Sequence, residues 1–209
     1  DPQIKLESFD IPGDPSAAAF FIVAGLINKN SELKINNICL NPTRALFIDI
    51  LIKMGGNIEI LNKRESGGEQ IADLLISSSD LKAIKIQEES IPFVIDEIPI
   101  LSLACSLAEG TSEIEGAEEL RFKESDRIKT TVGELKKLGS DIEETKNGIL
   151  IKGMDSLKGA DCESHNDHRI AMMIAVAATV AEGSTTINSA DSVSVSFPGF
   201  FDTLNMFRK

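Results

Sequence analysis

Three segments of the chain are apolar on nearly every helical face, the pattern of helices that are buried all round. They span residues 17–27, 98–108 and 170–181. Each is followed by a short segment of alternating apolar residues, which predicts a strand at residues 33–38, 112–114 and 184–187. Two of the helices end in almost the same way, in Ala108-Glu109-Gly110-Thr111 and Ala181-Glu182-Gly183-Ser184. The order therefore recurs with a period on the order of 70–80 residues.

Amphipathic helices follow the first two of these strands. One, at 43–54, stops at Gly55-Gly56, and the other, at 125–138, stops at Gly139. Further strands are expected at residues 58–60, 73–77, 83–86, around 142 and at 149–152, with residues 63–70 as a polar loop or hairpin connection. An extended lead-in over 1–12 and a last helix ending near 207 complete the pattern. We therefore expect one domain, residues 1–209, in which three related α/β units give an α+β fold.

Composition narrows the class of protein. The chain has 209 residues, 42% of them hydrophobic, and a formal net charge of -12, which argues against sequence-independent binding to nucleic acid. Its three cysteines, Cys39, Cys105 and Cys162, are far apart and predict neither a disulfide framework nor a zinc site. With no apolar run long enough to span a bilayer and no signal peptide, we expect a soluble cytoplasmic protein without a membrane partner. The start at Asp1, without an initiator Met, suggests a fragment.

Ionisable residues gather before three of the predicted helices. The run from Leu120 to Arg127, with sequence LRFKESDR, leads into an amphipathic helix; Asp96-Glu97 precedes the second buried helix, and Asn166-Asp167-His168-Arg169 precedes the third. Helix starts carry unpaired N–H groups and a positive dipole end, which favour phosphate and carboxylate groups. If the units pack around a common axis, these starts converge on one face. A structure with Asp96, Glu124 and Arg169 far apart would contradict this expectation.

Each feature also has a plainer interpretation. The charged run by itself is more typical of a capped helix start with solvated charges than of a site, and Asp96 by itself is more typical of a helix cap than of a catalytic residue. Arg44, in the first turn of another helix, is interpreted as a solvated charge. The loop Ser66-Gly67-Gly68-Glu69 lacks phosphate-loop spacing and predicts a turn. No cysteine lies at a zinc-ligand spacing from His165 or His168, so we expect no metal.

Several motifs together resemble the EPSP synthase (3-phosphoshikimate 1-carboxyvinyltransferase) family. The resemblance covers essentially the whole chain, and the order of the motifs makes it more specific than any single one. Asp96-Glu97-Ile98-Pro99-Ile100-Leu101 is most similar to the bacterial glyphosate-tolerant class. The other motifs are Pro12-Gly13-Asp14-Pro15-Ser16, Asn41-Pro42-Thr43-Arg44, Lys123-Glu124-Ser125-Asp126-Arg127, Asn166-Asp167-His168-Arg169-Ile170-Ala171-Met172 and Ser196-Phe197-Pro198.

The resemblance implies a fold and a reaction. The fold is an inverse α/β arrangement, in which three βαβαββ-like units place parallel helices inside and sheets outside. The family has two similar domains, and this chain corresponds to the carboxy-terminal one. In the reaction, the 5-hydroxyl of shikimate 3-phosphate adds to C2 of phosphoenolpyruvate while C3 is protonated. The adduct then loses phosphate and leaves an enolpyruvyl ether, without a metal or another cofactor.

The resemblance also implies roles for individual residues. Asp96 would hold the shikimate hydroxyls and serve as the base, and Glu124 would take part in proton transfer at the methylene or methyl carbon. Lys123 would contact the target hydroxyl or phosphoenolpyruvate. Two arginines, Arg127 and Arg169, would bind the anionic groups of phosphoenolpyruvate, with His168 adjacent to them. Guanidinium forks suit carboxylate and phosphate, and carboxylates set among cations can hold different protonation states.

One motif departs from the family, and two other functions remain open. Many members have a lysine just before the Phe-Pro near the carboxy terminus, where this chain has Ser194-Val195-Ser196, so that contact is absent or supplied elsewhere. Residues that bind shikimate 3-phosphate would lie in the other domain, so this chain alone is expected to be inactive. The alternatives are the related UDP-N-acetylglucosamine enolpyruvyl transferase, which the 166–169 motif disfavours, and a non-catalytic domain of the same fold.

Overall fold

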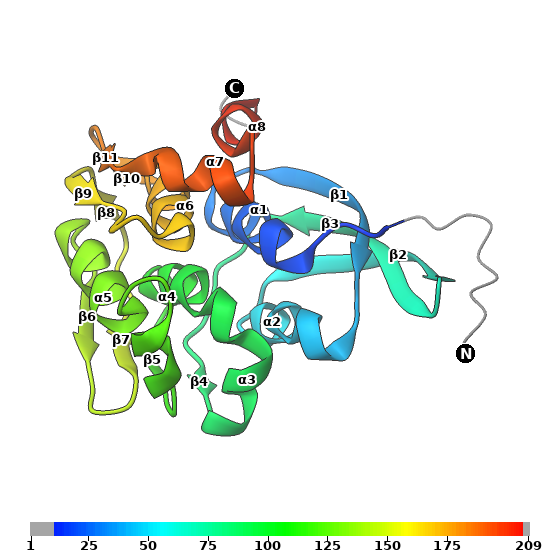
Figure 1. Cartoon of the computed structure of the whole chain (residues 1–209), viewed down its shortest axis with the longest axis horizontal. Helices are drawn as coiled ribbons and strands as arrows, with labels where there is room; N and C mark the ends of the chain where they lie inside the picture. The colour runs from blue at the N-terminus through cyan, green and yellow to red at the C-terminus, as the bar shows by residue number, and fades with distance from the viewer. Residues whose placement is uncertain (1–10, 207–209) are drawn as a thin grey trace, which may run out of the picture.

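The first repeat consists of two helices and a three-stranded antiparallel sheet. The computed structural model describes residues 11–206, so most of the lead-in predicted for residues 1–12 lies outside the described residues. Asp14 caps the first helix, because its carboxylate accepts hydrogen bonds from the N–H groups of Ser16 and Ala17. The strand order is β1-β3-β2. The elements are α1 (Pro15–Ile27), β1 (Glu32–Cys39), α2 (Pro42–Lys53), β2 (Asn57–Ser66) and β3 (Glu69–Ser77) (Figure 1).

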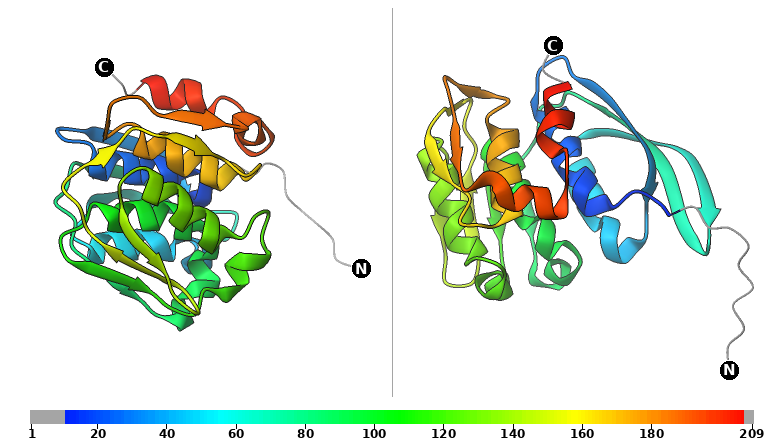
Figure 2. Two further views of the ribbon diagram at one scale, coloured as in Figure 1. Left: turned by 90° about the vertical axis from the view of Figure 1, so that its left-hand side faces the viewer. Right: turned by 45° about the horizontal axis from the view of Figure 1, so that its top comes forward.

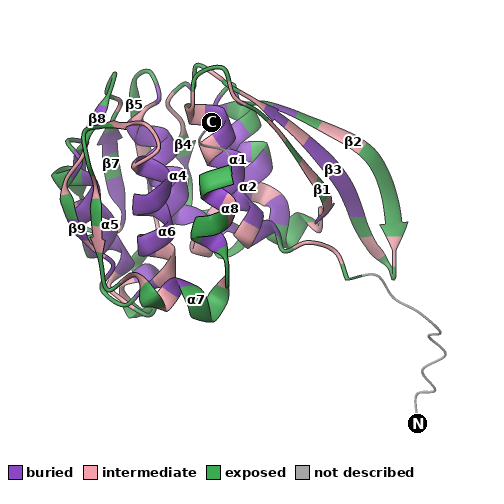
Figure 3. Cartoon of the chain, turned by 90° about the horizontal axis from the view of Figure 1, so that it is seen from above, coloured by how far each residue is buried: buried purple, intermediate pink, exposed green. Residues whose placement is uncertain are grey.

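Strands β2 and β3 form a longer hairpin than the sequence predicted. Residues 63–66 and 69–70 belong to the strands, and only Gly67 and Gly68, both with positive φ, make the turn. The loop interpretation of 63–70 was therefore wrong, and the hairpin interpretation was correct. The polar side chains of residues 63–66 suggested a loop because a strand is normally predicted from alternating apolar residues. The outer face of this sheet is exposed, so β2 continues without that alternation (Figure 3).

The second repeat follows the same order, and a parallel strand is added in front. Strand β4 pairs parallel to β5, and β5, β7 and β6 are antiparallel neighbours, which gives the order β4-β5-β7-β6. Two short 3-10 turns, η2 (Ile95–Glu97) and η3 (Glu118–Phe122), precede helices α4 and α5. The remaining elements are β4 (Lys85–Ile86), α3 (Ile91–Val94), α4 (Ile98–Ser106), β5 (Thr111–Ile114), α5 (Arg127–Lys137), β6 (Asp141–Glu144) and β7 (Ile149–Lys152).

The third repeat is shorter than the other two. Its strands form two parallel pairs, β8 with β10 and β9 with β11, and each pair joins a strand before the buried helix to a strand after it. Among the described residues, the strands of this repeat form no antiparallel hairpin, which distinguishes it from the other two. The elements are β8 (Leu157–Lys158), β9 (Asp161–Glu163), α6 (His168–Ala177), β10 (Ala181–Glu182), β11 (Thr186–Asn188), α7 (Val193–Ser196) and α8 (Phe200–Met206).

The long helices run in the same direction. At the far end of α1, the Asn28 side chain donates a hydrogen bond to Thr179 Oγ1, just beyond α6, at 2.8 Å. Likewise, Ser140 and Ser106, just beyond α5 and at the end of α4, are joined at 2.7 Å. The starts of these helices lie together at the opposite end, as the contacts below show. Their positive dipole ends therefore converge on one face of the molecule.

Sheets lie on the outside and helices on the inside (Figure 2). Every residue of α4 is buried, as is α6 from Ile170 to Ala177 (Figure 3). Two serines in α4 remain satisfied there, because Ser102 and Ser106 donate to backbone carbonyls one turn earlier. The inverse α/β fold class is thus confirmed. No helix among residues 11–206 is both long and apolar enough to cross a membrane.

Candidate active site

Arg127 and Asp167 form a fully buried ion pair where α5 and α6 begin. The side chain of Arg127 is 1% exposed and that of Asp167 is 0% exposed; Arg127 Nε donates to Asp167 Oδ2 at 2.8 Å. Asp167 caps α6 by accepting a hydrogen bond from the Arg169 N–H at 2.9 Å, and Ser125 Oγ donates to it at 2.9 Å. Two helix starts are therefore joined through one carboxylate.

The pKa values in this pair are set by opposing effects. Burial by itself raises the pKa of Asp167, but hydrogen bonds from Arg127, Arg169 and Ser125 and the charge of Arg127 hold it below its usual range. Burial likewise lowers the pKa of Arg127, while the three carboxylates Asp167, Glu124 and Asp96 raise it. Both groups therefore stay charged, and removal of either leaves an uncompensated buried charge.

Asp96, at the start of α4, lies among three cations from the starts of α5 and α6. One of its oxygens, Oδ1, lies 3.0 Å from Arg127 Nη1 and 3.8 Å from Lys123 Nζ, and Oδ2 lies 3.5 Å from Arg169 Nη2. The Asp96 side chain is 40% exposed, so it can contact a ligand while it remains paired. Glu124 is more exposed, at 52%, and binds Arg127 Nη2 at 2.6 Å. The structure thus places Asp96, Glu124 and Arg169 together, which confirms the predicted convergence of the helix starts.

Arg169 is partly exposed and is held from its buried side. Its side chain is 14% exposed, and Nη1 donates to the backbone oxygen of Asp96 at 3.1 Å. Glu97 lies behind it, with Oε1 at 3.8 Å from Nη1. Oε1 of Glu97 is buried and has no hydrogen-bond partner among residues 11–206. Desolvation raises the pKa of Glu97, although a hydrogen bond from Ser16 and the charge of Arg169 oppose the shift.

A small pocket of about 50 Å³ lies between the starts of α1 and α6. His168 and Arg169 line it from α6, Asp14 and Ser16 from α1, and Ser196 and Phe197 from the end of α7. Burial, together with the charge of Arg169, lowers the pKa of His168, which favours the neutral imidazole. The pocket has room for a water molecule or a few ligand atoms. A larger hollow of about 370 Å³ between α1 and β1 is mainly apolar and contains none of the predicted site residues.

Two other sequence interpretations concern the edge of this region. Arg44 is 54% exposed, as expected for a solvated charge, but it is also paired: Nη2 contacts Asp14 Oδ1 at 3.0 Å and Ser16 Oγ at 3.2 Å. Val195, in the position just before the Ser-Phe-Pro motif, is 87% exposed. Among the described residues, no lysine lines the pocket beside Ser196.

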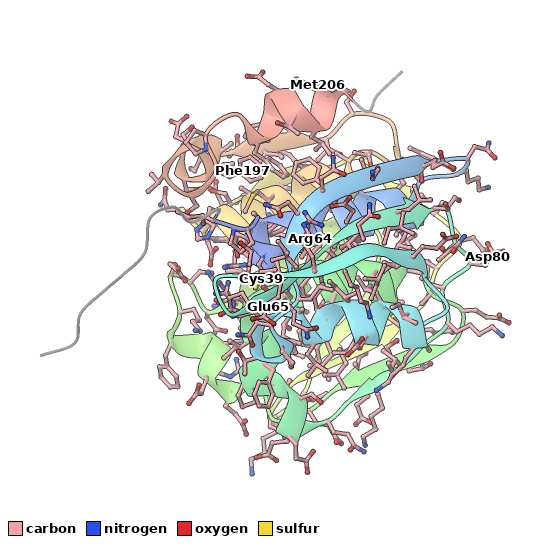
Figure 4. The ribbon with its side chains drawn as sticks, turned by 90° about the vertical axis from the view of Figure 1, so that its right-hand side faces the viewer. Cys39, Arg64, Glu65, Asp80, Phe197 and Met206 are labelled. Atoms are coloured by element: carbon pink, nitrogen blue, oxygen red, sulfur yellow. The ribbon has the colours of Figure 1, made fainter. Side chains whose placement is uncertain are left out.

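The β2–β3 hairpin reaches this end of the molecule. Asn41, which caps α2, donates from Nδ2 to Glu69 Oε2 at 3.1 Å, so the hairpin tip is tied to a helix start. In Figure 4, Cys39 and Glu65 lie toward the same end of the sheet as Phe197, and Asp80 lies at the opposite end. The side chains near the hairpin tip therefore border the face on which the helices begin.

Sequence reasoning missed the contacts of three polar residues, of which Asp167 and Glu97 are buried and Ser125 is half-buried. Asp167 and Glu97 stood within the quoted motifs but were not proposed as site residues, and Ser125 was counted only as part of a helix start. A signal for Asp167 was available, because an Asp directly before a fully apolar helix predicts a cap. Nothing in the sequence indicates that the same carboxylate also binds Arg127. Arg127, predicted to bind an anionic ligand, is instead enclosed here by three carboxylates; its role in binding stays a prediction.

The region has the composition of an anion site that also contains two partly exposed carboxylates. Cations from Lys123, Arg127 and Arg169 meet Asp96 and Glu124 beside three positive helix ends. Such a site can bind phosphate or carboxylate groups and move protons through Asp96 and Glu124. Among residues 11–206, no group of three or more His, Cys, Asp or Glu side chains is arranged to hold a metal ion.

Comparisons with known proteins agree with this geometry. Residues 1–204 match the family model described as EPSP synthase (3-phosphoshikimate 1-carboxyvinyltransferase). The enzyme of that name from Syntrophomonas wolfei is 50% identical over 204 residues, which are 97% of this chain and 48% of that protein. The one from Thermoanaerobacter sp. (strain X514) is 48% identical over 196 residues, which are 94% of this chain and 46% of that protein.

Comparison of the fold with solved structures points to the same family. The solved structure of EPSP synthase from Acinetobacter baumannii superposes with a TM-score of 0.91 at 40% identity, covering 95% of this chain and 46% of that one. The chain thus spans about half the length of the relatives it matches. On the family match, the identities and the shared fold, this chain belongs to the EPSP synthase family.

Proposed function

We propose that this chain is the carboxy-terminal domain of a 3-phosphoshikimate 1-carboxyvinyltransferase and supplies half of its active site. The reaction would join the 5-hydroxyl oxygen of shikimate 3-phosphate to C2 of phosphoenolpyruvate, with a proton added at C3. Loss of phosphate from C2 and of a proton from C3 then gives the enolpyruvyl ether. The observation that carries the proposal is the meeting of Asp96, Lys123, Glu124 and Arg169 at the helix starts of a chain of this family.

The two exposed carboxylates suit the two proton transfers. Asp96 would hold the shikimate hydroxyls and accept the proton of the attacking hydroxyl, with Lys123 beside it. Glu124 would give a proton to C3 and later remove one. Its carboxylate lies just before α5 and is half exposed, so a substrate can reach it. Fixed cations around the adduct stabilise charge as it develops, and this contributes more to the rate than ground-state binding of the anions does.

Arg169 is the guanidinium best placed to bind phosphoenolpyruvate directly. It is partly exposed, lines the small pocket beside His168, and is supported from behind by Asp96 and Glu97. Arg127 would reach an anionic group only by exchanging Glu124 for it, since Asp167 and Asp96 occupy its other nitrogens. Such an exchange would free the Glu124 carboxylate at the moment of binding.

Both substrates and a second domain would complete the site. Asp96 and Glu124 stand 40% and 52% exposed, and the small pocket is far too small for shikimate 3-phosphate. The partner of this chain is therefore an amino-terminal half of the same enzyme, which would bind shikimate 3-phosphate and cover these carboxylates. On this basis the isolated chain is inactive. We also retain the assignment to the glyphosate-tolerant class, on the 96–101 motif, and a cytoplasmic location as predictions.

The test is reconstitution of the enzyme. This chain is mixed with its amino-terminal half, and phosphate release from phosphoenolpyruvate and shikimate 3-phosphate is measured beside that of the uncut protein. Activity in either sample supports the proposal, and absence from both would refute it and favour a non-catalytic domain of the same fold. The same assay with UDP-N-acetylglucosamine in place of shikimate 3-phosphate tests the related enolpyruvyl transferase. Phosphate release with UDP-N-acetylglucosamine alone would favour that enzyme.

A further inference from the structure

Helix α5 contacts the connection between β9 and α6 at two places. The first contact is the buried pair of Arg127 with Asp167, which belongs to the site already described. The second involves Glu134, seven positions later and thus on the same face of the helix. Glu134 lies away from the other site residues, and the proposed chemistry does not use it. Its side chain is nevertheless only 3% exposed.

Glu134 accepts hydrogen bonds from three sources. Its Oε2 accepts from the backbone N–H of Glu163, at the end of β9, at 3.0 Å. Its Oε1 lies 2.8 Å from His165 Nε2, and Lys137 Nζ approaches both oxygens, at 3.0 and 2.9 Å. Burial opposes ionisation, but these hydrogen bonds and the charge of Lys137 hold the pKa of Glu134 below its usual value. A charged carboxylate thus fixes two points of the connection.

The connection held in this way has an unfavourable backbone conformation. His165 and Asn166 have φ of 56° and 55°, two consecutive left-handed residues that both carry a Cβ. Ser164 also supports the turn, since its Oγ accepts from the Asn166 N–H and donates to the Ser189 carbonyl. Directly after this turn comes Asp167, the cap of α6. A shift in the turn therefore moves the residues that follow it.

We propose that Glu134 is a positioning residue, which holds the left-handed 165–166 turn so that Asp167 and Arg169 take their places in the anion site. Glu134 acts through His165 and the Glu163 N–H and touches no substrate. The inference deepens the proposed function, because it rests on Arg169 as the ligand of phosphoenolpyruvate. Its structural part, control of the turn, can be measured without any catalytic activity.

The contact with Lys137 supplies a matched control. Lys137 is 45% exposed and binds the same carboxylate from the same helix, but it does not touch the 163–167 connection. Glu134→Gln removes the acceptor for the Glu163 N–H or for His165, whereas Lys137→Gln removes the ion pair with Glu134 and leaves both of these acceptors in place. A second variant, His165→Asn, breaks the contact with Glu134 and keeps a residue type that tolerates the left-handed conformation.

The first measurement is amide hydrogen exchange of this chain. In Glu134→Gln, we expect faster exchange at the N–H groups of Glu163 and Asp167, with little change in helix α4. In Lys137→Gln, the exchange rates in both regions should stay the same as in the wild type. Exchange that quickens equally throughout the chain would overturn the proposal, because it would show a general loss of stability. If Glu134→Gln does not fold, His165→Asn decides by the same criterion.

The second measurement is steady-state kinetics in the complete enzyme. Glu134→Gln and His165→Asn should raise the KM for phosphoenolpyruvate, by on the order of tenfold for Glu134→Gln, as expected for a loosened charged contact. In both variants the KM for shikimate 3-phosphate should change by less than about twofold. In Lys137→Gln, the KM values for both substrates should also change by less than about twofold. An unchanged KM for phosphoenolpyruvate would overturn the proposal. A wild-type enzyme without activity would refute the proposed function instead, and exchange alone would then decide the role of Glu134.

Discussion

Two Arg–Asp pairs each join the start of an amphipathic helix to the cap of a buried helix, and they differ in their exposure to water. In the first repeat, Arg44 in the first turn of α2 pairs at 3.0 Å with Asp14, the cap of α1, and both side chains are more than half exposed. Between the second and third repeats, Arg127 at the start of α5 pairs at 2.8 Å with Asp167, the cap of α6. There, neither side chain is more than 1% exposed.

The difference shows how one kind of contact between helix starts can serve two purposes. An exposed pair gains little, because water and salt screen both charges. A buried pair must be compensated on every side, and Arg127 accordingly contacts Asp96 and Glu124 as well as Asp167. Those additional carboxylates are the two that we propose for proton transfer. The buried pair therefore connects the stability of the chain with the geometry of its site, whereas the exposed pair only ties two helix starts together.

The largest effect is expected from Arg127→Met. Methionine fills a similar volume but leaves Asp167 charged and buried without its cation, so we expect a loss of roughly 3–5 kcal/mol in the free energy of unfolding. Urea denaturation of the chain, followed by circular dichroism, measures it. A loss below about 1 kcal/mol would mean that burial does not distinguish the two pairs.

Arg169→Lys tests a guanidinium whose exposure lies between that of the buried Arg127 and that of the exposed Arg44. Lysine keeps the charge but loses the planar fork, so we expect the KM for phosphoenolpyruvate in the complete enzyme to rise about 10- to 100-fold. The unfolding midpoint of the chain should move little. Arg64→Lys, on the outer sheet, is the matched control and should leave the KM unchanged. Equal effects of both substitutions would contradict the assignment of Arg169.

Asp73 provides a carboxylate held mainly by neutral donors. Hydrogen bonds from the Asn62 side chain and the Asn37 N–H, with the charges of Arg64 and Lys34, lower its pKa from 3.8 to about 2. Because the pKa is lower in the folded state, this stabilisation is full above pH 4 and is lost as the pH falls toward 2. Asp73→Asn should therefore unfold more easily than the wild type at pH 7, and the two should converge near pH 2. A difference independent of pH would contradict this account.

The smallest effect is expected from Arg44→Met. Removal of an exposed pair should change the free energy of unfolding by about 0–1 kcal/mol. The change should shrink further in 1 M salt, where the screening length is only about 3 Å. The same urea titration at low and high salt checks both statements. A loss as large as that of Arg127→Met would show that the first-repeat pair is equally important to the fold.

The helical framework could be predicted from the sequence because its signals are local. The three apolar segments became α1, α4 and α6, and the amphipathic ones became α2 and α5. Boundaries were less accurate: the third buried helix was predicted to run to residue 181 and ends at Ala177. The two-residue strands β8 and β10 have too few residues for any periodicity, and only their parallel pairing defines them.

The site could be predicted in outline but not in its buried connections. The clustering of Asp96, Glu124 and Arg169 followed from repeated helix starts and from the family resemblance. The enclosure of Arg127 and the burial of Glu97, whose Oε1 has no hydrogen-bond partner among the described residues, depend on how three helix ends pack together. Periodicity reports which face of one helix is buried and says nothing about which charges meet across several. Glu134 was unremarkable for that reason, since it looks like any polar residue of an amphipathic helix.

The parallel pairs of the third repeat have a consequence for the order of folding. Strands β8 and β9 precede α6, and their partners β10 and β11 follow it, so neither pair can form until the chain has passed through the buried helix. The β2–β3 hairpin, in contrast, closes through two glycines. Contacts between distant residues form slowly because the loop between them must close first. We therefore expect the first repeat to fold early and docking of α6 to be a late step, completed when the β9–β11 ladder closes over it.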